Sequence, residues 1–413
     1  MFLRISHKIV TFIKLIISSL FGWFILVPFA LIIPKKNQIV FLEQSPERFY
    51  DNVKYFYLYL CRQPLGDIGC VYLTRNEDLF NELKKHGLPV AMENSLRGKI
   101  LMLRAKIAIE DGLGLGKNLK SFLLFSAQKI QLWHGTAIKK VELQKYDNHG
   151  LTRGTIPKLF WTFAGRHQFY HIFVSSSDIS TQNYSSAFRY ATAIEAGYPR
   201  TDLFFGGSDE AFMLGADVAG YERIKHLKRE GYKIALYMPT FRDFGGDAIS
   251  DGVLDLLRLA EFGTKNRIAF ILKFHVNNKR KDTIHLLSAD NFVCYDNSKD
   301  IYPVLPLADL LITDYSSVFF DFLLLDKPVL FFPYDYEKYL EKDRGMVLDY
   351  DSVTPGTKCK TQGELEREMK AMLCDGIDHH AEKRKETCGL FWKYIDGGAS
   401  ERIWDRLKKE LLA

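Results

Sequence analysis

The sequence has few of the residues that mark disulfide scaffolds and metal centres. Its six cysteines are scattered over 413 residues, with no CxxC pair and no histidine at zinc-ligand spacing. We therefore expect free thiols in a reducing compartment and no protein metal site. Hydrophobic residues (47%) and charged residues (26%) occur at globular values, which excludes a disordered, collagen-like or polytopic membrane chain. The length exceeds the roughly 250–300 residues at which a single core stops growing, so we expect two domains.

Acidic residues are missing from the first 36 positions, which hold five basic residues. This segment carries +5 of the net charge of +6, which leaves +1 for the rest of the chain. A nucleic-acid-binding protein needs a basic groove in its folded part, and this charge distribution supplies none. We expect the basic end to face an anionic membrane surface, and we expect no nucleic-acid partner.

A charge-free stretch, LIISSLFGWFILVPFALII, occupies residues 15–33 and is long enough to cross a bilayer. A cleaved signal peptide is the alternative, but it has a shorter apolar core and an A-x-A-like site, which the sequence lacks. Gly22 and Pro28 interrupt the stretch and basic residues flank both ends, so a single spanning helix and a monotopic anchor are both compatible with it. We predict a location at the cytoplasmic face of the cell membrane, peripheral, monotopic or single-span.

Beyond Lys36, short apolar runs alternate with helical patterns such as 77–86, 156–169 and 177–188. The runs form two groups, 39–43, 69–73, 105–110, 129–133 and 171–176, then 233–238, 268–274, 291–295, 310–313 and 328–332. Apolar runs without alternation are typical of parallel strands that are buried on both faces. We therefore predict an α/β fold with two Rossmann-like domains.

The predicted division of the chain has three parts. These are a membrane segment over 1–36, a first domain over 37–208 and a second domain over 209–413. The second domain ends in a charged helical tail over 361–412, with Trp392 and Trp404 on its apolar face. We expect this tail to pack back across the body.

Ligands of open parallel sheets bind beyond the carboxyl ends of the strands, where two histidines stand. His134 follows the run at 129–133, and an imidazole can remove a proton from a hydroxyl near neutral pH. His275, with Lys273, ends the run at 268–274 and could stabilise charge on a phosphate leaving group. The alternatives are a helix-capping role for His134 and an ordinary surface strand end for His275.

Hydroxyls and arginines follow other predicted strands. Ser316 and Ser317 precede an apolar helix, whose free amides and dipole favour a phosphate, although Asp-Ser-Ser is also an ordinary N-cap. Arg200 in GYPRTD and Arg242 in PTFRD suit anion recognition. The GLGLG run at 112–116 departs from the dinucleotide fingerprint, and we interpret it as a flexible loop.

Taken in order, the motifs WHGT, GYPRTD, PTFRD, KFH and TDYSSVFFDF resemble those of the CDP-glycerol glycerophosphotransferase family. This family comprises teichoic acid primases and polymerases of bacterial cell walls, and the resemblance covers residues 39–335. It implies a GT-B-like fold in which an acceptor domain and a CDP-donor domain face a cleft. It also implies a membrane-attached N-terminus.

The resemblance also implies roles for single residues. His134 would activate the acceptor hydroxyl, and His275 would assist at the pyrophosphate. The implied substrate-binding residues are Gly135, Thr136, Arg166, Pro199, Arg200, Thr240, Phe241, Arg242, Ser316, Ser317 and Asp321. Arg166 is a looser match, and Ser175-Ser176-Ser177 stands where family members commonly show Ser-Pro-Asn.

The implied activity is transfer of glycerol phosphate, or a related alditol phosphate, from a CDP-linked donor to a hydroxyl of a membrane-linked acceptor. CMP is released, and the product is a teichoic acid or capsule-type polymer. We expect no cofactor, although Mg²⁺ on the donor pyrophosphate is compatible with this chemistry. The alternatives are a GT-B glycosyltransferase that uses a nucleotide sugar and an inactive membrane scaffold. The sequence leaves open the acceptor, the alditol, the number of units added and the oligomeric state.

Overall fold

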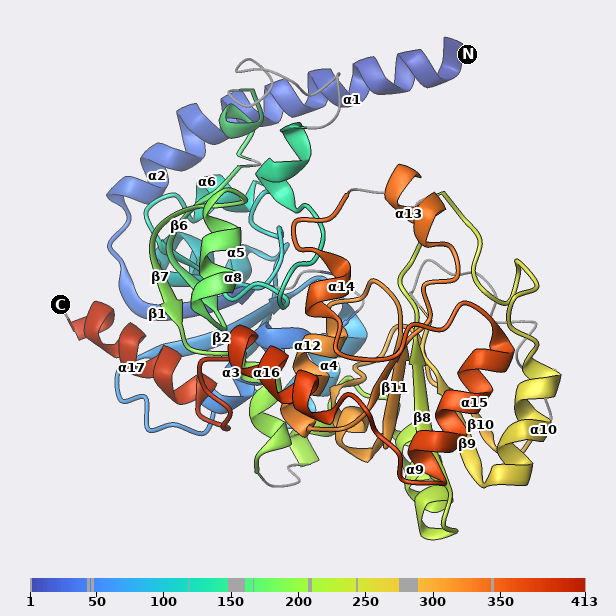
Figure 1. Cartoon of the computed structure of the whole chain (residues 1–413). Coiled ribbons are helices and arrows are strands. Elements are labelled where there is room, and N and C mark those ends of the chain that lie inside the picture. The colour runs from blue at the N-terminus through green and yellow to red at the C-terminus, as the bar shows by residue number, and fades with distance from the viewer. Residues whose placement is uncertain are drawn as a thin grey trace.

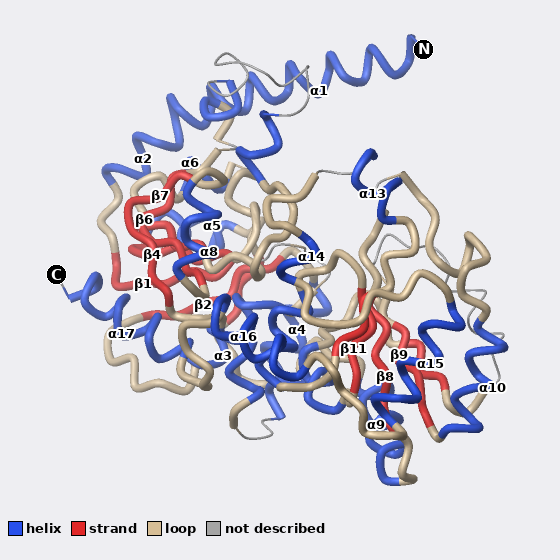
Figure 2. The backbone as a smooth tube through the Cα atoms, viewed as in Figure 1, coloured by secondary structure: helices blue, strands red, loops and turns tan. Residues whose placement is uncertain are grey.

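The computed structural model describes residues 2–42, 45, 48–117, 119–147, 160–165, 167–206, 210–242, 244–274, 289–342 and 345–412. Two parallel sheets lie in separate halves of the molecule, and helices surround both of them (Figures 1 and 2). The predicted α/β fold is therefore confirmed.

The first half contains a seven-stranded sheet in the order β3-β2-β1-β4-β5-β6-β7. Its strands are β1 (Lys36–Leu42), β2 (Gly69–Thr74), β3 (Val90–Met92), β4 (Ala105–Glu110), β5 (Gln128–Gln131), β6 (Phe169–Ser175) and β7 (Arg189–Glu195). The apolar runs predicted five of them. The two edge strands form no apolar run, because β3 has three residues and β7 is exposed or half-buried throughout.

Successive residues of the central strands are buried on opposite faces of this sheet. In β1, Ile39 and Phe41 belong to one apolar cluster, and Val40 and Leu42 belong to another. This double burial explains why the run lacks an alternating pattern. The covering helices are α3 (Asp51–Leu60), α4 (Glu77–Lys85), α5 (Leu96–Arg104), α6 (Lys120–Leu123) and α8 (Asp178–Ser185), with a 3₁₀ turn at Glu142–Asp147. The predicted helix over 156–169 is described only from residue 160 onward, where 160–163 are helical.

The second half contains a five-stranded sheet in the order β10-β9-β8-β11-β12. Its strands are β8 (Lys233–Met238), β9 (Ile268–Leu272), β10 (Phe292–Cys294), β11 (Leu310–Thr313) and β12 (Val329–Phe331), and each lies within a predicted run. The helices are α9 (Val218–Arg229), α10 (Leu256–Asn266), α12 (Val318–Phe322), α13 (Tyr336–Lys342), α14 (Tyr350–Val353) and α15 (Gln362–Leu373). Short 3₁₀ helices occur at Pro199–Phe204, Glu210–Met213, Tyr302–Leu307 and Leu323–Leu325.

The C-terminal tail returns to the first half through α16 (Ala381–Phe391) and α17 (Ala399–Leu412). Trp392 is buried and donates a hydrogen bond from Nε1 to the Phe320 carbonyl (2.8 Å). Trp404 is buried in the same apolar cluster as β1 and α3. The predicted return of the tail is confirmed. The division at residue 209 stays a prediction, and the last helix of the second segment packs on the first sheet.

The N-terminal segment consists of α1 (Phe2–Phe21), a π-helical turn (Gly22–Leu26) and α2 (Val27–Ile32). Residues Phe12–Ile32 are long and apolar enough to cross a membrane, with a mean hydropathy of 2.4. The segment lies along the outside of the first half, next to α6 (Figure 1). Trp23 Nε1 donates to the Phe163 carbonyl (2.8 Å), and the Ser126 hydroxyl donates to the Ala30 carbonyl (2.6 Å).

Candidate active site

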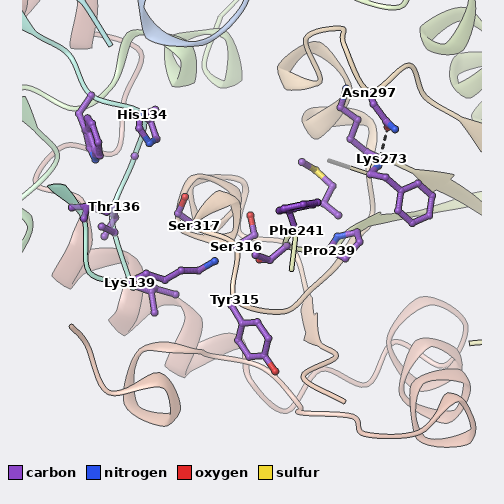
Figure 3. A pocket seen from close by; sticks show the side chains of 18 of the residues that line it. His134, Thr136, Lys139, Pro239, Phe241, Lys273, Asn297, Tyr315, Ser316 and Ser317 are labelled. Atoms are coloured by element: carbon purple, nitrogen blue, oxygen red, sulfur yellow. Dashed lines mark hydrogen bonds between the residues drawn. The ribbon is translucent and has the colours of Figure 1, made fainter. Parts of the chain in front are cut away.

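A cavity of about 500 Å³ lies between the two halves, at the carboxyl ends of strands from both sheets. Its lining includes seven residues that the sequence predicted, namely His134, Gly135, Thr136, Thr240, Phe241, Ser316 and Ser317. Figure 3 shows Ser316 and Ser317 between His134 and Thr136 on one side and Pro239 and Phe241 on the other. The structure therefore brings together motifs that are more than 180 positions apart in the sequence.

His134 stands on a sharp turn that follows β5, three residues after Gln131. Trp133 has φ +53° and Gly135 has φ +109°, so the backbone reverses around the histidine. The Nδ1 atom lies 3.0 Å from the Asp111 carbonyl oxygen. Because a carbonyl only accepts hydrogen bonds, Nδ1 carries the hydrogen, and Nε2 of the neutral ring keeps its lone pair. Burial lowers the pKa of His134, which favours this neutral form, and Asp51 acts against the shift.

The turn is held by side chains from three other segments. Asn52, at the start of α3, donates from Nδ2 to the Trp133 carbonyl (2.7 Å) and accepts from the Arg200 amide (3.1 Å). Gln131 accepts from the Trp133 amide (2.9 Å). The Tyr184 hydroxyl donates to the Gly135 carbonyl. Both sides of His134 in the chain are thus fixed by buried hydrogen bonds.

Arg200 and Asp321 lie behind the wall of the cavity. Arg200 pairs with Asp51 through Nη1 (2.6 Å) and with Asp321 through Nη2 (2.7 Å), and its exposed fraction is 2%. Asp321 is fully buried and also accepts from the Tyr302 hydroxyl. The Arg200–Asp321 pair connects the first half to the second. The structure does not place either side chain in the cavity lining, and their contact with a substrate stays a prediction.

Arg242 has a similar internal position. Its guanidinium pairs with Asp335 (2.8 Å) and Asp314 (2.8 Å), and Nη1 donates to the Thr240 carbonyl (2.7 Å). Asp314 in turn accepts from the Thr240 amide (2.8 Å). Arg242 thereby joins the loop that presents Thr240 to the loop that presents Ser316. It is absent from the cavity lining among the described residues, and its predicted substrate contact remains untested.

Ser316 and Ser317 lie between β11 and α12, as predicted. Ser317 is the N-cap residue of α12, yet among the residues that the structure describes its hydroxyl caps no backbone amide. The Ser316 hydroxyl lies 3.5 Å from the Val318 amide. Both side chains are half-buried and face the cavity (Figure 3). Thr240 Oγ1, which lines the same cavity, is buried without a hydrogen-bond partner in the described part of the chain.

Residues 25–409 match the family described as CDP-Glycerol:Poly(glycerophosphate) glycerophosphotransferase. The chain belongs to this family. The teichoic acid poly(ribitol-phosphate) polymerase of Bacillus spizizenii is 30% identical over 286 residues, which are 68% of this chain and 43% of that protein. The teichoic acid glycerol-phosphate transferase of Staphylococcus aureus is 28% identical over 394 residues, which are 91% of this chain and 94% of that protein.

A solved structure of the wall teichoic acid polymerase TagF superposes with a TM-score of 0.70 at 23% identity. The match covers 92% of this chain and 90% of that one. The predicted family and the predicted GT-B-like fold are therefore confirmed. The chain spans less than half the length of the first two curated relatives that it matches, 43% and 44%.

Three further predicted site residues of this glycerophosphotransferase-family chain are not among the described residues of the cavity lining. His275 and Arg166 fall outside the described residues, so their roles stay predictions. Pro199 is buried at the start of a 3₁₀ helix and lines a different cavity of about 280 Å³. Within the described ranges, no three His, Cys, Asp or Glu side chains converge as metal ligands, and the predicted lack of a cofactor remains untested.

The motifs missed several residues of this cavity. Arg48, Lys139 and Asn297 line it, and Asn52 supports the turn at His134 from behind. Lys139 extends into the cavity next to Ser317 (Figure 3). Its position three residues after Thr136 was a usable signal, because a loop that follows a strand end points toward the same edge of the sheet. Arg48 and Asn52 gave no such signal, since Arg48 precedes α3, Asn52 lies in its first turn, and the motifs do not include this helix.

Proposed function

We propose that this protein transfers an alditol phosphate, glycerol phosphate in particular, from a CDP-linked donor to a hydroxyl of a membrane-linked acceptor, with release of CMP. One observation carries the proposal. His134 holds its hydrogen on Nδ1, and it shares a cavity with the Ser316 and Ser317 hydroxyls of the opposite half. A proton acceptor thus faces hydrogen-bond donors that suit a phosphate.

The chemistry follows from these positions. Nε2 of His134 takes the proton of the acceptor hydroxyl, and the oxygen attacks the distal phosphorus of the donor. A new phosphorus–oxygen bond forms as the bond to CMP breaks, and CMP leaves with the electron pair. Ser316, Ser317 and Lys139 meet the charge on the phosphate oxygens. Mg²⁺ on the donor diphosphate is compatible with this scheme, and the proton transfer to His134 does not depend on it.

The relatives support an alditol phosphate as the transferred group. Their names include both glycerol phosphate and ribitol phosphate, so the alditol is best tested directly. The Staphylococcus aureus glycerol-phosphate transferase, which the match covers over 94% of its length, favours glycerol phosphate. The predicted acceptor is a lipid-linked saccharide or a growing polymer.

The position of the N-terminal segment favours a monotopic anchor over a spanning helix. Its inner face contacts the first half, where an added Cβ at Gly22 would overlap the Phe122 ring. Its outer face exposes large apolar side chains, including Phe24 (73%) and Ile32 (79%). A spanning helix would have to break the inner contacts, whereas a helix in the membrane plane keeps them. We propose attachment at the cytoplasmic face, in contact with anionic lipid through the exposed basic residues Lys14 and Lys36.

The direct test of the active site is His134→Ala. We expect release of CMP from CDP-glycerol to fall by about two to four orders of magnitude, because general-base catalysis contributes that much. His226→Ala, which changes a half-exposed histidine on α9, is the matched control and should behave as wild type. Near-normal turnover by His134→Ala, with a correctly folded protein, would remove the general-base role.

The alternative activities have their own readouts. Parallel incubation with CDP-glycerol, CDP-ribitol and UDP-sugars shows which nucleotide is released. Release of UDP alone would favour glycosyl transfer. Failure to bind any CDP-alditol would favour a scaffold.

A further inference from the structure

Arg48 is a cation of the cavity lining that no motif of the sequence includes. It lies in the loop between β1 and α3, and its guanidinium is 5.3 Å from the Tyr50 ring centroid. Its Nη2 atom is buried and, within the described ranges, has no hydrogen-bond partner, while another part of the side chain is hydrogen-bonded to Tyr50. A buried N–H group without an acceptor is unfavourable, so Nη2 of Arg48 is suited to bind an anion that enters the cavity.

A second cation faces the same space from the other half. Lys273 lies directly after β9 and lines the cavity, and its ammonium donates to the Asp296 and Lys299 carbonyls. Burial lowers the pKa of Lys273 to about 7, and the nearby charge of Arg48 contributes to this shift. Asp300, Asp296 and Asp217 act in the opposite direction from the second half. Arg48 and Lys273 therefore border the same cavity from opposite halves of the molecule.

The position of Lys273 separates it from Lys139. Figure 3 shows Lys273 and Asn297 across the cavity from His134 and Lys139, with Ser316 and Ser317 between them. The cavity therefore has basic side chains at two ends. One diphosphate at the serines and Lys139 would leave the other end without an anion.

From this arrangement we infer that Arg48 and Lys273 form a phosphate-binding subsite that spans the cleft and holds a phosphate group of a substrate. The inference rests on the proposed function and deepens it. The phosphate has two sources, the diphosphate of the donor and a terminal phosphodiester of the acceptor. An acceptor that ends in an alditol phosphate would place that phosphodiester near its reacting hydroxyl.

The test compares wild type, Arg48→Gln and Arg48→Lys. The matched control is Arg229→Gln, which removes an exposed charge from α9. KM is measured for CDP-glycerol and for two lipid-linked acceptors, one ending in a glycerol phosphate unit and one without it. Inorganic pyrophosphate is titrated by calorimetry. We expect Arg48→Gln to raise the KM for the substrate whose phosphate the subsite holds by about ten-fold or more, because a charged hydrogen bond to that phosphate is lost.

Each outcome has one meaning. A higher KM for CDP-glycerol, with weaker pyrophosphate binding, assigns the subsite to the donor. A higher KM only for the phosphate-ended acceptor assigns it to the acceptor. Arg48→Lys keeps the charge without the planar fork, so it should fold and give an intermediate KM. Values within two-fold of wild type for both variants would overturn the inference.

The proposed function can fail separately. Wild type that releases no CMP would contradict the proposed function, and the pyrophosphate titration would then decide the subsite. An affinity for pyrophosphate that falls about ten-fold in Arg48→Gln but not in Arg229→Gln supports the subsite. Equal affinity for pyrophosphate in all variants overturns the subsite.

Discussion

At the scale of residues, the account depends on how firmly His134 is held. The Asp111 carbonyl fixes its tautomer, and Asn52 fixes the carbonyl of the preceding residue. Asn52 is fully buried, so its loss leaves the Trp133 carbonyl without its partner. The histidine is thus positioned by a residue that itself does not line the cavity.

Asn52→Ala should therefore lower kcat about ten-fold through misplacement of His134, and cost about 1–3 kcal/mol in the free energy of unfolding. Asn266→Ala, which removes a hydrogen bond at the end of α10, is the control with a structural cost alone. Steady-state kinetics and urea unfolding measure the two effects. Unchanged kcat in a destabilised Asn52→Ala protein would show that Asn52 serves stability only.

The lowered pKa of His134 gives a pH prediction. The neutral form of His134, which acts as the base, persists at pH values below the ordinary histidine pKa of about 6.5. The value of kcat/KM should therefore rise with pH along a limb centred below about pH 6.5. In the same range the unfolded chain binds more protons than the folded one, so His134 contributes a loss of stability as pH falls below about 6.5. A pH–rate profile of CMP release tests this. A limb centred above 7 would contradict it.

The sequence predicted the residues of the site unevenly. His134, Ser316 and Ser317 stand directly after strand-like runs, and the structure places them in one cavity. Arg200 and Arg242 have the same kind of position, yet each guanidinium is paired with two carboxylates. Those partners lie in other segments of the chain, and a motif read alone does not reveal them.

At the scale of elements, the loop after β5 determines the shape of the site. Gly135 has φ +109°, and an added Cβ would overlap Arg200 Nη2. A larger residue would strain the backbone and push against the Arg200–Asp321 pair that connects the halves.

Gly135→Ala should lower the free energy of unfolding by about 1–3 kcal/mol and reduce CMP release at least ten-fold. Gly389→Ala in α16, where an added Cβ meets nothing within 4 Å, is the matched control. It should be neutral or slightly stabilising, because alanine favours a helix. Thermal unfolding with activity assays measures both. A Gly135→Ala protein as stable and active as wild type would contradict the tight packing of this turn.

The N-terminal segment gives a second prediction at this scale. Phe24 and Ile32 are exposed on its outer face, so Phe24→Glu with Ile32→Glu should weaken binding to vesicles of phosphatidylglycerol and phosphatidylcholine at least ten-fold. Leu390→Glu, which changes an exposed leucine of α16, is the control. Co-sedimentation measures the bound fraction. Equal binding by all three proteins would show that the membrane contact lies elsewhere.

At the scale of the whole molecule, the sequence predicted two sheets but not how they meet. The apolar runs give the central strands because burial on both faces leaves a local pattern. The junction consists of buried polar groups from distant segments, such as Lys54 with Asp300 (2.7 Å) and Arg200 with Asp321 (2.7 Å). Such pairs leave no periodic signal. These ion pairs hold the two halves together around the cavity in which His134 of the first half faces the hydroxyls of Ser316 and Ser317 of the second.

The most direct test of the central claim is the mass of the product formed from CDP-glycerol and a synthetic lipid-linked acceptor. The account predicts that the acceptor gains one or more glycerol phosphate units, with one CMP released for each unit. It also predicts that His134→Ala lowers both the gain of glycerol phosphate units and the release of CMP by about two to four orders of magnitude. An acceptor that stays unmodified with every CDP-alditol, or that instead gains a sugar from a UDP-linked donor, would contradict the account.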